Sequence, residues 1–497
     1  MNRESFKEFR RQSPKGIFIN YGVLLYKLVK SFWVLIPIFF SKNIGDKWGY
    51  IVSVIGGLFL VLFVIAVVQY IYFKFKIEGD QFVLNKGMIF KKKIAIPIER
   101  IQSVNFKQNI VHQLIQVTQV EIQTAGAKDV EVSIKALSRE IAEALKSKLQ
   151  NRNENIEVDS LEPEVEKAKL IYSLGVMELL KVSFSENHLR SFFWILAITF
   201  SFGYQLEDIV KEWNFADEVI QFAVLNKEEI TGSIFALFVL LVVGVAISVI
   251  VSFFRVFLSH FDQKVEYLNE GIQVSEGLFT RREDILKIQK IQYVVQVTNP
   301  VKQLMGIGTI RIKQAGSAKV KKKKLVELVG VKKPIQNQLN SLFFDYEQHS
   351  DAVEYKPAPY YLFRMFVRSA FFVSFVNLVF YFNAFSFVEF VVMNAFLFPL
   401  AIFLVLIKYK KTYFTFQEEI LVVGDGKIST VTTVMPYFKT QNILFQQSII
   451  QKKRGVATLK FQTASGVIKL PCLRLEDALN IQQKVLIEVE NSKRDWI

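Results

Sequence analysis

The chain has 497 residues, of which 51% are hydrophobic and 14% aromatic, with 47 Phe and only 11 Pro. This composition excludes a disordered or collagen-like chain and favours membrane spans that alternate with folded domains. The single cysteine, Cys472, excludes a disulfide framework and a cysteine-rich metal site. The formal net charge of +16 makes an anionic membrane surface a natural neighbour.

Apolar runs occur in three pairs along the chain, and in each pair a weak or short run precedes a stronger one. Four runs are long enough, or nearly so, to cross a hydrocarbon core about 30 Å thick: residues 50–73, 233–254, 369–385 and 390–407. The run at 32–40 is short, but its helix could begin near Tyr21. The run at 191–204 could be re-entrant or interfacial instead. We expect six spans in three hairpins, with two surface helices as the alternative.

Charge flanking these runs predicts the topology. Lys and Arg precede the first run of each pair and follow the second, whereas the loop at 205–230 inside the second pair is mostly acidic. The positive-inside bias therefore predicts a multi-pass protein with both termini and every long polar segment in the cytoplasm. No cleavable signal peptide is expected, because the first residues are polar and no short apolar segment with a cleavage site follows.

A threefold repeat is the strongest feature of the sequence. A shift of 190 residues aligns 98–126 with 288–316 without a gap, and a shift of 339 residues adds a third copy. At these shifts a glutamine recurs as Gln102, Gln292 and Gln441, and a glycine recurs as Gly87, Gly277 and Gly426. The repeating unit is therefore a membrane hairpin followed by a domain of roughly 80–90 residues.

Each domain is predicted to place strands first and a helix last. Period-two alternation in the first copy predicts strands at 81–89, 94–98, 117–123 and 130–134. The spacing of apolar residues predicts a helix at 138–149. The third copy predicts a turn at Ser465-Gly466 and a helix at 476–485. Short antiparallel strands closed by one C-terminal helix are typical of a pleckstrin-homology-like architecture.

Motifs within the repeat make this match more specific. The pattern is Gly-(Met/Leu)-(Ile/Phe), Ile-Pro-x-x-Arg-Ile-Gln-x-Val, Gln-Leu and Ile-Gln-Thr-Ala-Gly, each set placed after a two-span hairpin. It resembles the bacterial PH-like domain of YdbS/YdbT-type membrane proteins, and three copies are similar to the longer, YdbT-like members. The second copy departs from the pattern at Lys287 and Lys290, and the third at Lys439-Thr440 and Ser465. The resemblance implies a PH-like fold in the bacterial inner membrane, and no established catalytic residues.

We therefore predict an α+β membrane protein in which three transmembrane hairpins are each followed by a PH-like β-barrel or sandwich domain with a C-terminal helix. The predicted boundaries are hairpins at 17–73, 170–258 and 364–407, domains at 74–150, 259–343 and 408–490, and linkers at 151–169 and 344–363. Residues 170–180 are apolar with a period near 3.6 and predict an amphipathic helix before the second hairpin.

Clustered basic residues are candidate contacts for anionic lipid headgroups: Lys91, Lys92, Lys93, Arg281, Arg282, Lys321, Lys322, Lys323, Lys324, Lys452, Lys453 and Arg454. Each such contact contributes about 1 kcal/mol close to the membrane surface. The alternative is solvated turn residues in a domain already tethered by helices. A phosphoinositide pocket is not favoured, because no basic spacing recurs in all three copies. Nucleic acid is not an expected partner, because no binding motif is present.

Residues for catalysis are not apparent. The histidines are widely separated and match no metalloprotease or triad spacing: His112, His188, His260 and His349. Cys472 is expected in buried packing, and Gln102 as an amide cap at a strand end. We predict no enzyme activity, and no catalytic, cofactor-binding or metal-binding residues.

These features favour a non-enzymatic membrane scaffold with three cytoplasmic PH-like domains. Edge strands and a flat sheet face suit self-association or a protein partner. One alternative is a component of a transport, envelope-export or resistance system, which usually places broken helices or polar residues inside the membrane. A second alternative is a sensor of anionic lipid, for which Lys321–Lys324 would contribute to binding.

Overall fold

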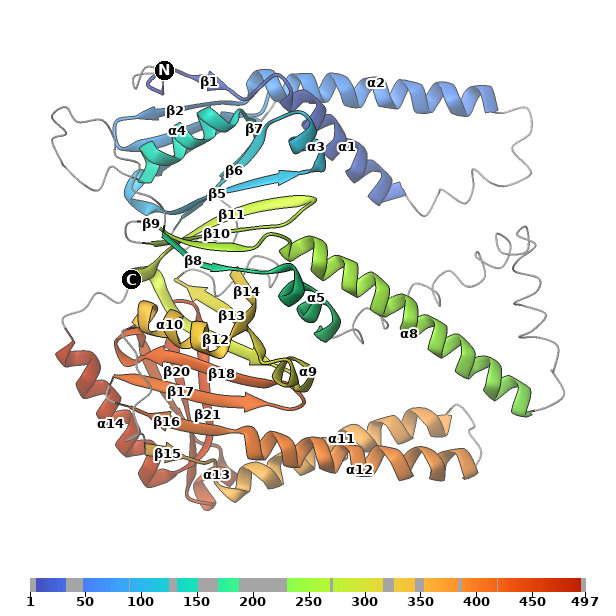
Figure 1. The fold of residues 1–497 in the computed structure, drawn as a ribbon, viewed down its shortest axis with the longest axis vertical. Helices are drawn as coiled ribbons and strands as arrows, with labels where there is room; N and C mark the ends of the chain where they lie inside the picture. The colour runs from blue at the N-terminus through green and yellow to red at the C-terminus, as the bar shows by residue number, and fades with distance from the viewer. Residues whose placement is uncertain are drawn as a thin grey trace.

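The computed structural model describes residues 6–32, 48–88, 90–124, 132–150, 169–186, 230–268, 271–315, 326–344, 353–382, 387–417 and 419–492. It shows three modules of mixed α+β structure in a row, each with one or two long helices that leave it in the same direction (Figure 1). The predicted α+β class is confirmed.

Each module has the same order of elements. Module 1 contains β1 (Arg10–Arg11), α1 (Gly16–Phe32), α2 (Trp48–Tyr72), β2 (Lys74–Glu78), β3 (Gln81–Lys86), β4 (Lys92–Pro97), β5 (Ile101–Asn109), α3 (Ile110–Leu114), β6 (Thr118–Thr124), β7 (Val132–Leu137) and α4 (Arg139–Gln150). Module 2 contains β8 (Lys169–Ser173), α5 (Val176–Ser185), α8 (Ile230–His260), β9 (Lys264–Leu268), β10 (Gly271–Glu276), β11 (Thr280–Lys287), β12 (Ile291–Thr298), α9 (Pro300–Leu304), β13 (Ile307–Gln314), β14 (Val326–Lys332) and α10 (Lys333–Phe344). Module 3 contains β15 (Val353–Tyr355), α11 (Pro359–Phe382), α12 (Phe387–Lys411), β16 (Tyr413–Phe416), β17 (Ile420–Gly426), β18 (Thr430–Pro436), β19 (Asn442–Gln446), α13 (Ile449–Lys453), β20 (Val456–Thr463), β21 (Gly466–Arg474) and α14 (Leu475–Asn491).

The shifts of 190 and 339 residues hold in the backbone. A 3-10 turn occurs at Ile98–Arg100, Ile288–Lys290 and Tyr437–Lys439, and the one-turn helices α3, α9 and α13 begin at corresponding residues. The residue after each one-turn helix and its cap has positive φ: Gln116, Gly306 and Gly455. The repeat predicted from the sequence is therefore a repeat of structure.

The core of each module lies between two sheets joined by the 3-10 turn. In module 1, Phe75 and Leu84 of the first sheet pack with Val104 and Ile122 of the second, and Leu145 of α4 closes the same core. All five side chains are at most 1% exposed. Burial of apolar side chains from both sheets and the helix supplies the main stabilising free energy of such a domain.

Strand β5 is a central element that the sequence pattern does not predict. Its neighbours β3, β4, β6 and β7 were predicted within a few residues, but β5 has no period-two alternation. Ser103, Val104, Asn105 and Phe106 are all buried, so both faces of this strand are covered.

Both edges of β5 are also paired, because the modules share their sheets. The second sheet of module 1 continues into the first sheet of module 2, in the order β7-β6-β5-β11-β10-β9-β8. The second sheet of module 2 continues into module 3, in the order β14-β13-β12-β18-β17-β16-β15. A four-stranded sheet, β1-β2-β3-β4, and a three-stranded sheet, β19-β20-β21, form the two ends of the row.

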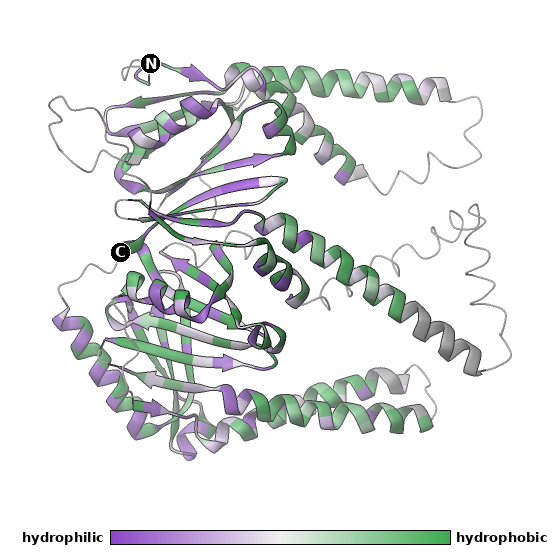
Figure 2. Cartoon of the chain, in the orientation of Figure 1, coloured by the Kyte–Doolittle hydropathy of each residue, from purple (hydrophilic) through white to green (hydrophobic). Residues whose placement is uncertain are grey.

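Among the described residues, four helices are long and apolar enough to cross a membrane: Val52–Tyr72, Val242–His260, Pro359–Leu378 and Phe390–Lys411. Figure 2 shows that these helices are predominantly hydrophobic. In the third module α11 and α12 pack side by side as a hairpin, and in the first module Tyr21 of α1 contacts Phe63 of α2 with ring centroids 5.7 Å apart. The run at 191–204 and residues 33–40 of the first short run lie outside the described residues, so six spans remain a prediction.

The segment before the second hairpin differs from its prediction. Lys169–Ser173 forms strand β8 on the edge of a sheet, and the helix α5 begins only at Val176. Tyr172 explains the difference, because its side chain is buried and its hydroxyl donates to the Val329 carbonyl at 2.8 Å. Strand β15 occupies the corresponding place within the predicted linker 344–363.

Candidate functional site: membrane-facing turns and module junctions

A tight turn with a left-handed glycine joins the last two strands of each first sheet. We call residues 87–88 with 90–91, 277–280 and 426–429 the membrane-facing turns, because they belong to modules whose long helices are apolar enough to cross a membrane. Gly87, Gly277 and Gly426 have φ of 92°, 100° and 129°, and a Cβ there would lie 2.0–2.2 Å from the carbonyl oxygen three residues later. Only glycine fits this geometry, which explains why the residue recurs.

These turns lie against the ends of the long apolar helices. The backbone N–H groups of Gly277 and Leu278 donate to carbonyls of Phe261 and Leu258 at the end of α8, at 2.8 and 3.0 Å. At the end of α12, Lys408 pairs with Asp425 at 2.6 Å, and the Lys411 ammonium donates to the Ile428 carbonyl at 2.9 Å. In modules 2 and 3 the turns therefore sit where the long helix leaves the module.

Large apolar side chains are exposed at this level of every module. On the membrane-facing turns they are Met88, Phe90, Leu278, Phe279 and Ile428, and on the one-turn helices they include Ile110, Leu114, Val301, Leu304, Ile449 and Ile450. Phe90 is 88% exposed and Leu304 is 89% exposed. Apolar residues gathered in this way beside membrane helices are typical of an interfacial surface.

The predicted basic residues occupy two places at the same level. Lys91–Lys93 and Arg281-Arg282 lie in or just after the membrane-facing turns, and Lys452–Arg454 lie at the end of α13. Each of these side chains is exposed except Arg282, which is half-buried. Lys321–Lys324 lie outside the described residues.

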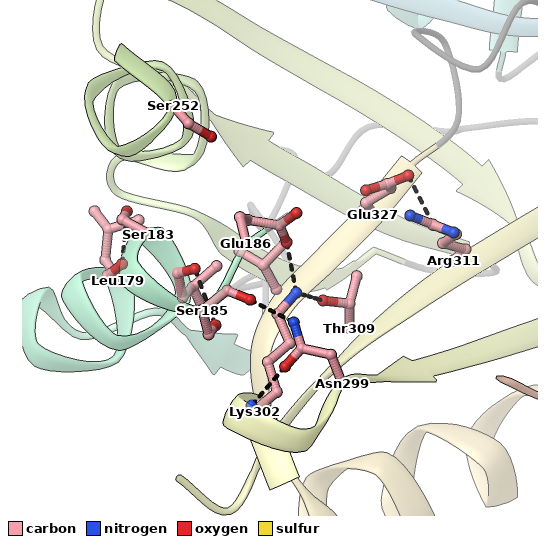
Figure 3. A network of polar contacts seen from close by, with 12 residues as sticks. Leu179, Ser183, Ser185, Glu186, Ser252, Asn299, Lys302, Thr309, Arg311 and Glu327 are labelled. Carbon is pink, nitrogen blue, oxygen red and sulfur yellow. Dashed lines mark hydrogen bonds and ion pairs between the residues drawn. The ribbon is translucent and has the colours of Figure 1, made fainter. Parts of the chain in front are cut away.

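Buried polar side chains hold the one-turn helices in position. Asn299 caps α9 by accepting from the Lys302 N–H at 2.7 Å, and its amide donates to the Ser185 carbonyl at the end of α5 (Figure 3). The buried Lys302 ammonium pairs with Glu186 at 2.5 Å and donates to the Thr309 hydroxyl at 3.0 Å. This network fixes α9 against α5, so that Val301 and Leu304 point outward.

The residue corresponding to Lys302 is also buried and polar in the other modules. Burial lowers the pKa of His112 in module 1, where its ring contacts Asn109 and the Lys135 carbonyl. Gln451 in module 3 donates to the Thr458 hydroxyl at 3.0 Å and contacts Cys472. His112 is therefore held in buried packing, and Cys472 is buried as expected.

Strand pairing joins module 1 to module 2. Strand β5 pairs antiparallel with β11, with Gln108 opposite Arg281 and Phe106 opposite Glu283. The Arg139 guanidinium of α4 binds both carboxylate oxygens of Glu283, at 2.8 and 2.9 Å. The Gln113 amide of α3 donates to the Leu278 carbonyl at 3.1 Å, so the one-turn helix of one module touches the membrane-facing turn of the next.

Modules 2 and 3 are joined in the same way. Strand β12 pairs antiparallel with β18, with Val294 opposite Val434 and Val297 opposite Val431. The Lys439 ammonium donates to the Gln289 carbonyl at 2.6 Å. Tyr293 of β12 is buried within the core of module 3. Both junctions are therefore built from backbone pairing and side chains of both modules.

A model of the bacterial PH domain matches the chain at residues 25–153, 219–340 and 370–488. The chain belongs to the bacterial PH domain family. It is also 24% identical over 481 residues, which are 92% of this chain and 93% of the relative, to the UPF0699 transmembrane protein YdbT of Bacillus subtilis (strain 168). The resemblance stated from the motifs is thereby confirmed, and neither match indicates a catalytic family.

The repeated glutamine lies at or next to the start of a strand in each bacterial PH module. Gln102 lies inside β5, and Gln292 inside β12, each at a shift of the strand register that marks a β-bulge. Gln441 directly precedes β19, and its N–H donates to the Gln462 carbonyl at 2.8 Å. The expectation that the Gln102 amide caps a strand end stays a prediction.

Catalytic geometry is not apparent in the described part of the bacterial PH modules. No group of three or more His, Cys, Asp or Glu side chains gathers there in a way that could hold a metal ion. His188 and His349 lie outside that part. His260 contacts the Glu276 carboxylate at 2.7 Å beside the membrane-facing turn of module 2.

Proposed function

We propose that the protein is a non-enzymatic membrane scaffold whose three bacterial PH modules lie on the cytoplasmic surface of the inner membrane. The exposed apolar residues of the turns and one-turn helices enter the interfacial region, and the neighbouring basic residues contact anionic headgroups. The shared sheets hold the modules in one row along the membrane.

One observation carries this proposal: the same apolar and basic surface recurs in every module at the point where its membrane helices emerge. Val111, Val301 and Ile450 occupy equivalent positions on this surface, and all three are exposed. A solvated surface has no reason to keep large apolar side chains there in every copy. Lys91–Lys93 and Lys452–Arg454 add a positive charge that favours an anionic leaflet.

A polarity-sensitive fluorophore tests this proposal in the full chain. It is attached to Phe90→Cys, Phe279→Cys or Ile428→Cys in lipid nanodiscs, with Glu140→Cys on the exposed face of α4 as the matched control. We expect blue-shifted emission at the three turn sites, increasing with the fraction of anionic lipid, and water-like emission at the control. Water-like emission at all four sites would overturn the proposal.

A further inference from the structure

The two ends of the row are complementary halves of the junction that the chain makes twice internally. The four-stranded sheet ends in β4, which corresponds to β11 and β18. The three-stranded sheet ends in β19, which corresponds to β5 and β12. Among the described strands β4 pairs only with β3, and β19 only with β20. Joined edge to edge, they would make a third seven-stranded sheet in the order of the other two.

We propose that β19 of one copy pairs antiparallel with β4 of a second copy, so that copies assemble head to tail along the membrane. The partner is thus a second copy of this chain, and the inference rests on the proposed scaffold function. A head-to-tail contact of this type generates a ring or a filament, depending on the rotation between copies.

Both internal junctions have the same register once the repeat shifts are applied. Phe106 faces Glu283 in the first junction, and Val295 faces Thr433 in the second. The same offset places Phe445 opposite Lys93 of the second copy, Gln446 opposite Lys92, and Leu444 opposite Ile94. Two independent junctions with one register make the third register a definite prediction.

The exposed side chains of β19 indicate that this strand has the side chains of a junction but no partner strand within the described part of the chain. Phe106 is 3% exposed in the first junction, whereas Phe445 at the corresponding position of β19 is 36% exposed. Leu444 is 40% exposed, whereas Asn105 at its position is 9% exposed. The edge strand β19 therefore exposes apolar side chains at positions that the internal junctions cover. At the position of Lys107 it has the neutral Gln446.

The backbone of β4 is oriented for this pairing. The Ile98 N–H donates to the Asp80 carbonyl at 2.9 Å. Because backbone groups alternate in direction along a strand, this bond fixes which residues of β4 bond to β3: every second residue counted back from Ile98. The N–H and carbonyl groups of Lys93 and Ala95 consequently point away from β3, toward the outer edge. The N–H of Ile285, which corresponds to Ala95, points the same way and donates to the Asn105 side chain at 3.3 Å across the first junction.

The lysines of β4 do not prevent such pairing. Arg281 and Arg282 occupy the positions of Lys91 and Lys92 in module 2, and β11 still pairs with β5. Arg282 even faces Lys107 there, whereas Lys92 would face the neutral Gln446. At this pair the charge repulsion is therefore smaller in the proposed contact than in the one the chain already makes.

Disulfide crosslinking between differently tagged full-length copies tests the inference in native membranes. One copy carries Lys92→Cys and the other Gln446→Cys; the native Cys472 is buried. We expect a disulfide-linked dimer that contains both tags. The control pair, Lys92→Cys with Leu444→Cys, is displaced by two residues along the strand and should crosslink at least fivefold less.

A backbone substitution provides the second measurement. Ala95→Pro removes an outward-pointing donor without disturbing the ladder to β3, and should abolish the crosslink, whereas Ala95→Val should retain it. Equal crosslinking of the matched and displaced pairs, or none at 92–446, would overturn the inference. A crosslink from residue 92 to a different protein, instead of to residue 446 of a second copy, would also overturn the inference. If the turn fluorophores still report the membrane interface, the proposed function stands while self-assembly fails.

Discussion

Arg139 of the first module binds Glu283 of the second through two parallel hydrogen bonds, at 2.8 and 2.9 Å. The Glu283 side chain is 8% exposed, and Arg139 also lies over the Phe106 ring at 5.1 Å. This contact joins a C-terminal helix to the first sheet of the next module. It therefore connects two modules that are separate in the sequence.

Removing one partner of this pair should weaken the first junction. Glu283→Ala leaves Arg139 with only the exposed Glu143, and we expect a loss of about 1–3 kcal/mol in the free energy of unfolding. Thermal unfolding of the four proteins of a double-mutant cycle with Arg139→Ala measures the coupling. Additive effects of the two substitutions would show that the ion pair does not stabilise the junction.

Alanine at a membrane-facing turn should be far more disruptive than alanine at a neighbouring open glycine. Gly277→Ala places a Cβ 2.2 Å from the Thr280 carbonyl oxygen at φ 100°, and should cost about 2–4 kcal/mol. Gly306→Ala is the matched control, because its φ is also positive but nothing lies within 4 Å. It should cost about 1 kcal/mol, since Gln116 already occupies this position in module 1 at φ 55°. Equal losses in thermal stability would contradict the turn geometry.

Asp284 should make stability fall with rising pH. Burial, together with the nearby Glu276, raises its pKa from 3.8 to about 7, although Arg282 and Lys107 act in the opposite direction and Glu121 adds to the rise. The folded state therefore keeps a proton that the unfolded state releases between about pH 4 and pH 7, so stability is lost across this window. Asp284→Asn should flatten the profile and stabilise the protein at pH 8 by ~1–3 kcal/mol. An unchanged slope in chemical denaturation from pH 4 to pH 7 would exclude this effect.

A reciprocal amide pair links the two helices of the third hairpin. Asn377 and Asn394 each donate to the other's side-chain oxygen, at 2.9 and 2.8 Å. Asn377→Leu should destabilise the hairpin by about 0.6–1.7 kcal/mol, because interhelical amide bonds in membranes have this magnitude. Unfolding in detergent measures the loss, and the Asn377→Leu, Asn394→Leu double variant should be less unstable than the sum of both single variants. Strict additivity would argue against the pair.

The sequence predicts the repeated parts of this fold better than the contacts between them. Gly87 and its equivalents were found because a left-handed turn tolerates only glycine, and the helix α14 because its apolar residues keep a 3.6 period. Strand β5 was missed because burial on both faces removes the alternation of apolar and polar residues. Strand β8 was missed because its partner β9 lies far away in the sequence.

The candidate site was predicted only in its charged part. The clusters at Lys91–Lys93 and Lys452–Arg454 are visible as runs of basic residues, but Leu114, Leu304 and Ile449 look like ordinary core residues in the sequence. Their exposure follows from the caps and buried polar residues that orient the one-turn helices. The Gln-Leu motif at 113–114 lies in α3, but its recurrence does not by itself predict an exposed leucine.

In the proposed arrangement all three modules lie on one face of a single membrane, on the cytoplasmic side. Cysteines at Glu140, Lys333 and Glu476, which are exposed near the starts of α4, α10 and α14, report the side of each module. We predict that a membrane-impermeant maleimide labels none of the three in intact right-side-out vesicles and all three after permeabilisation. Labelling of any one of them in intact vesicles would contradict the account.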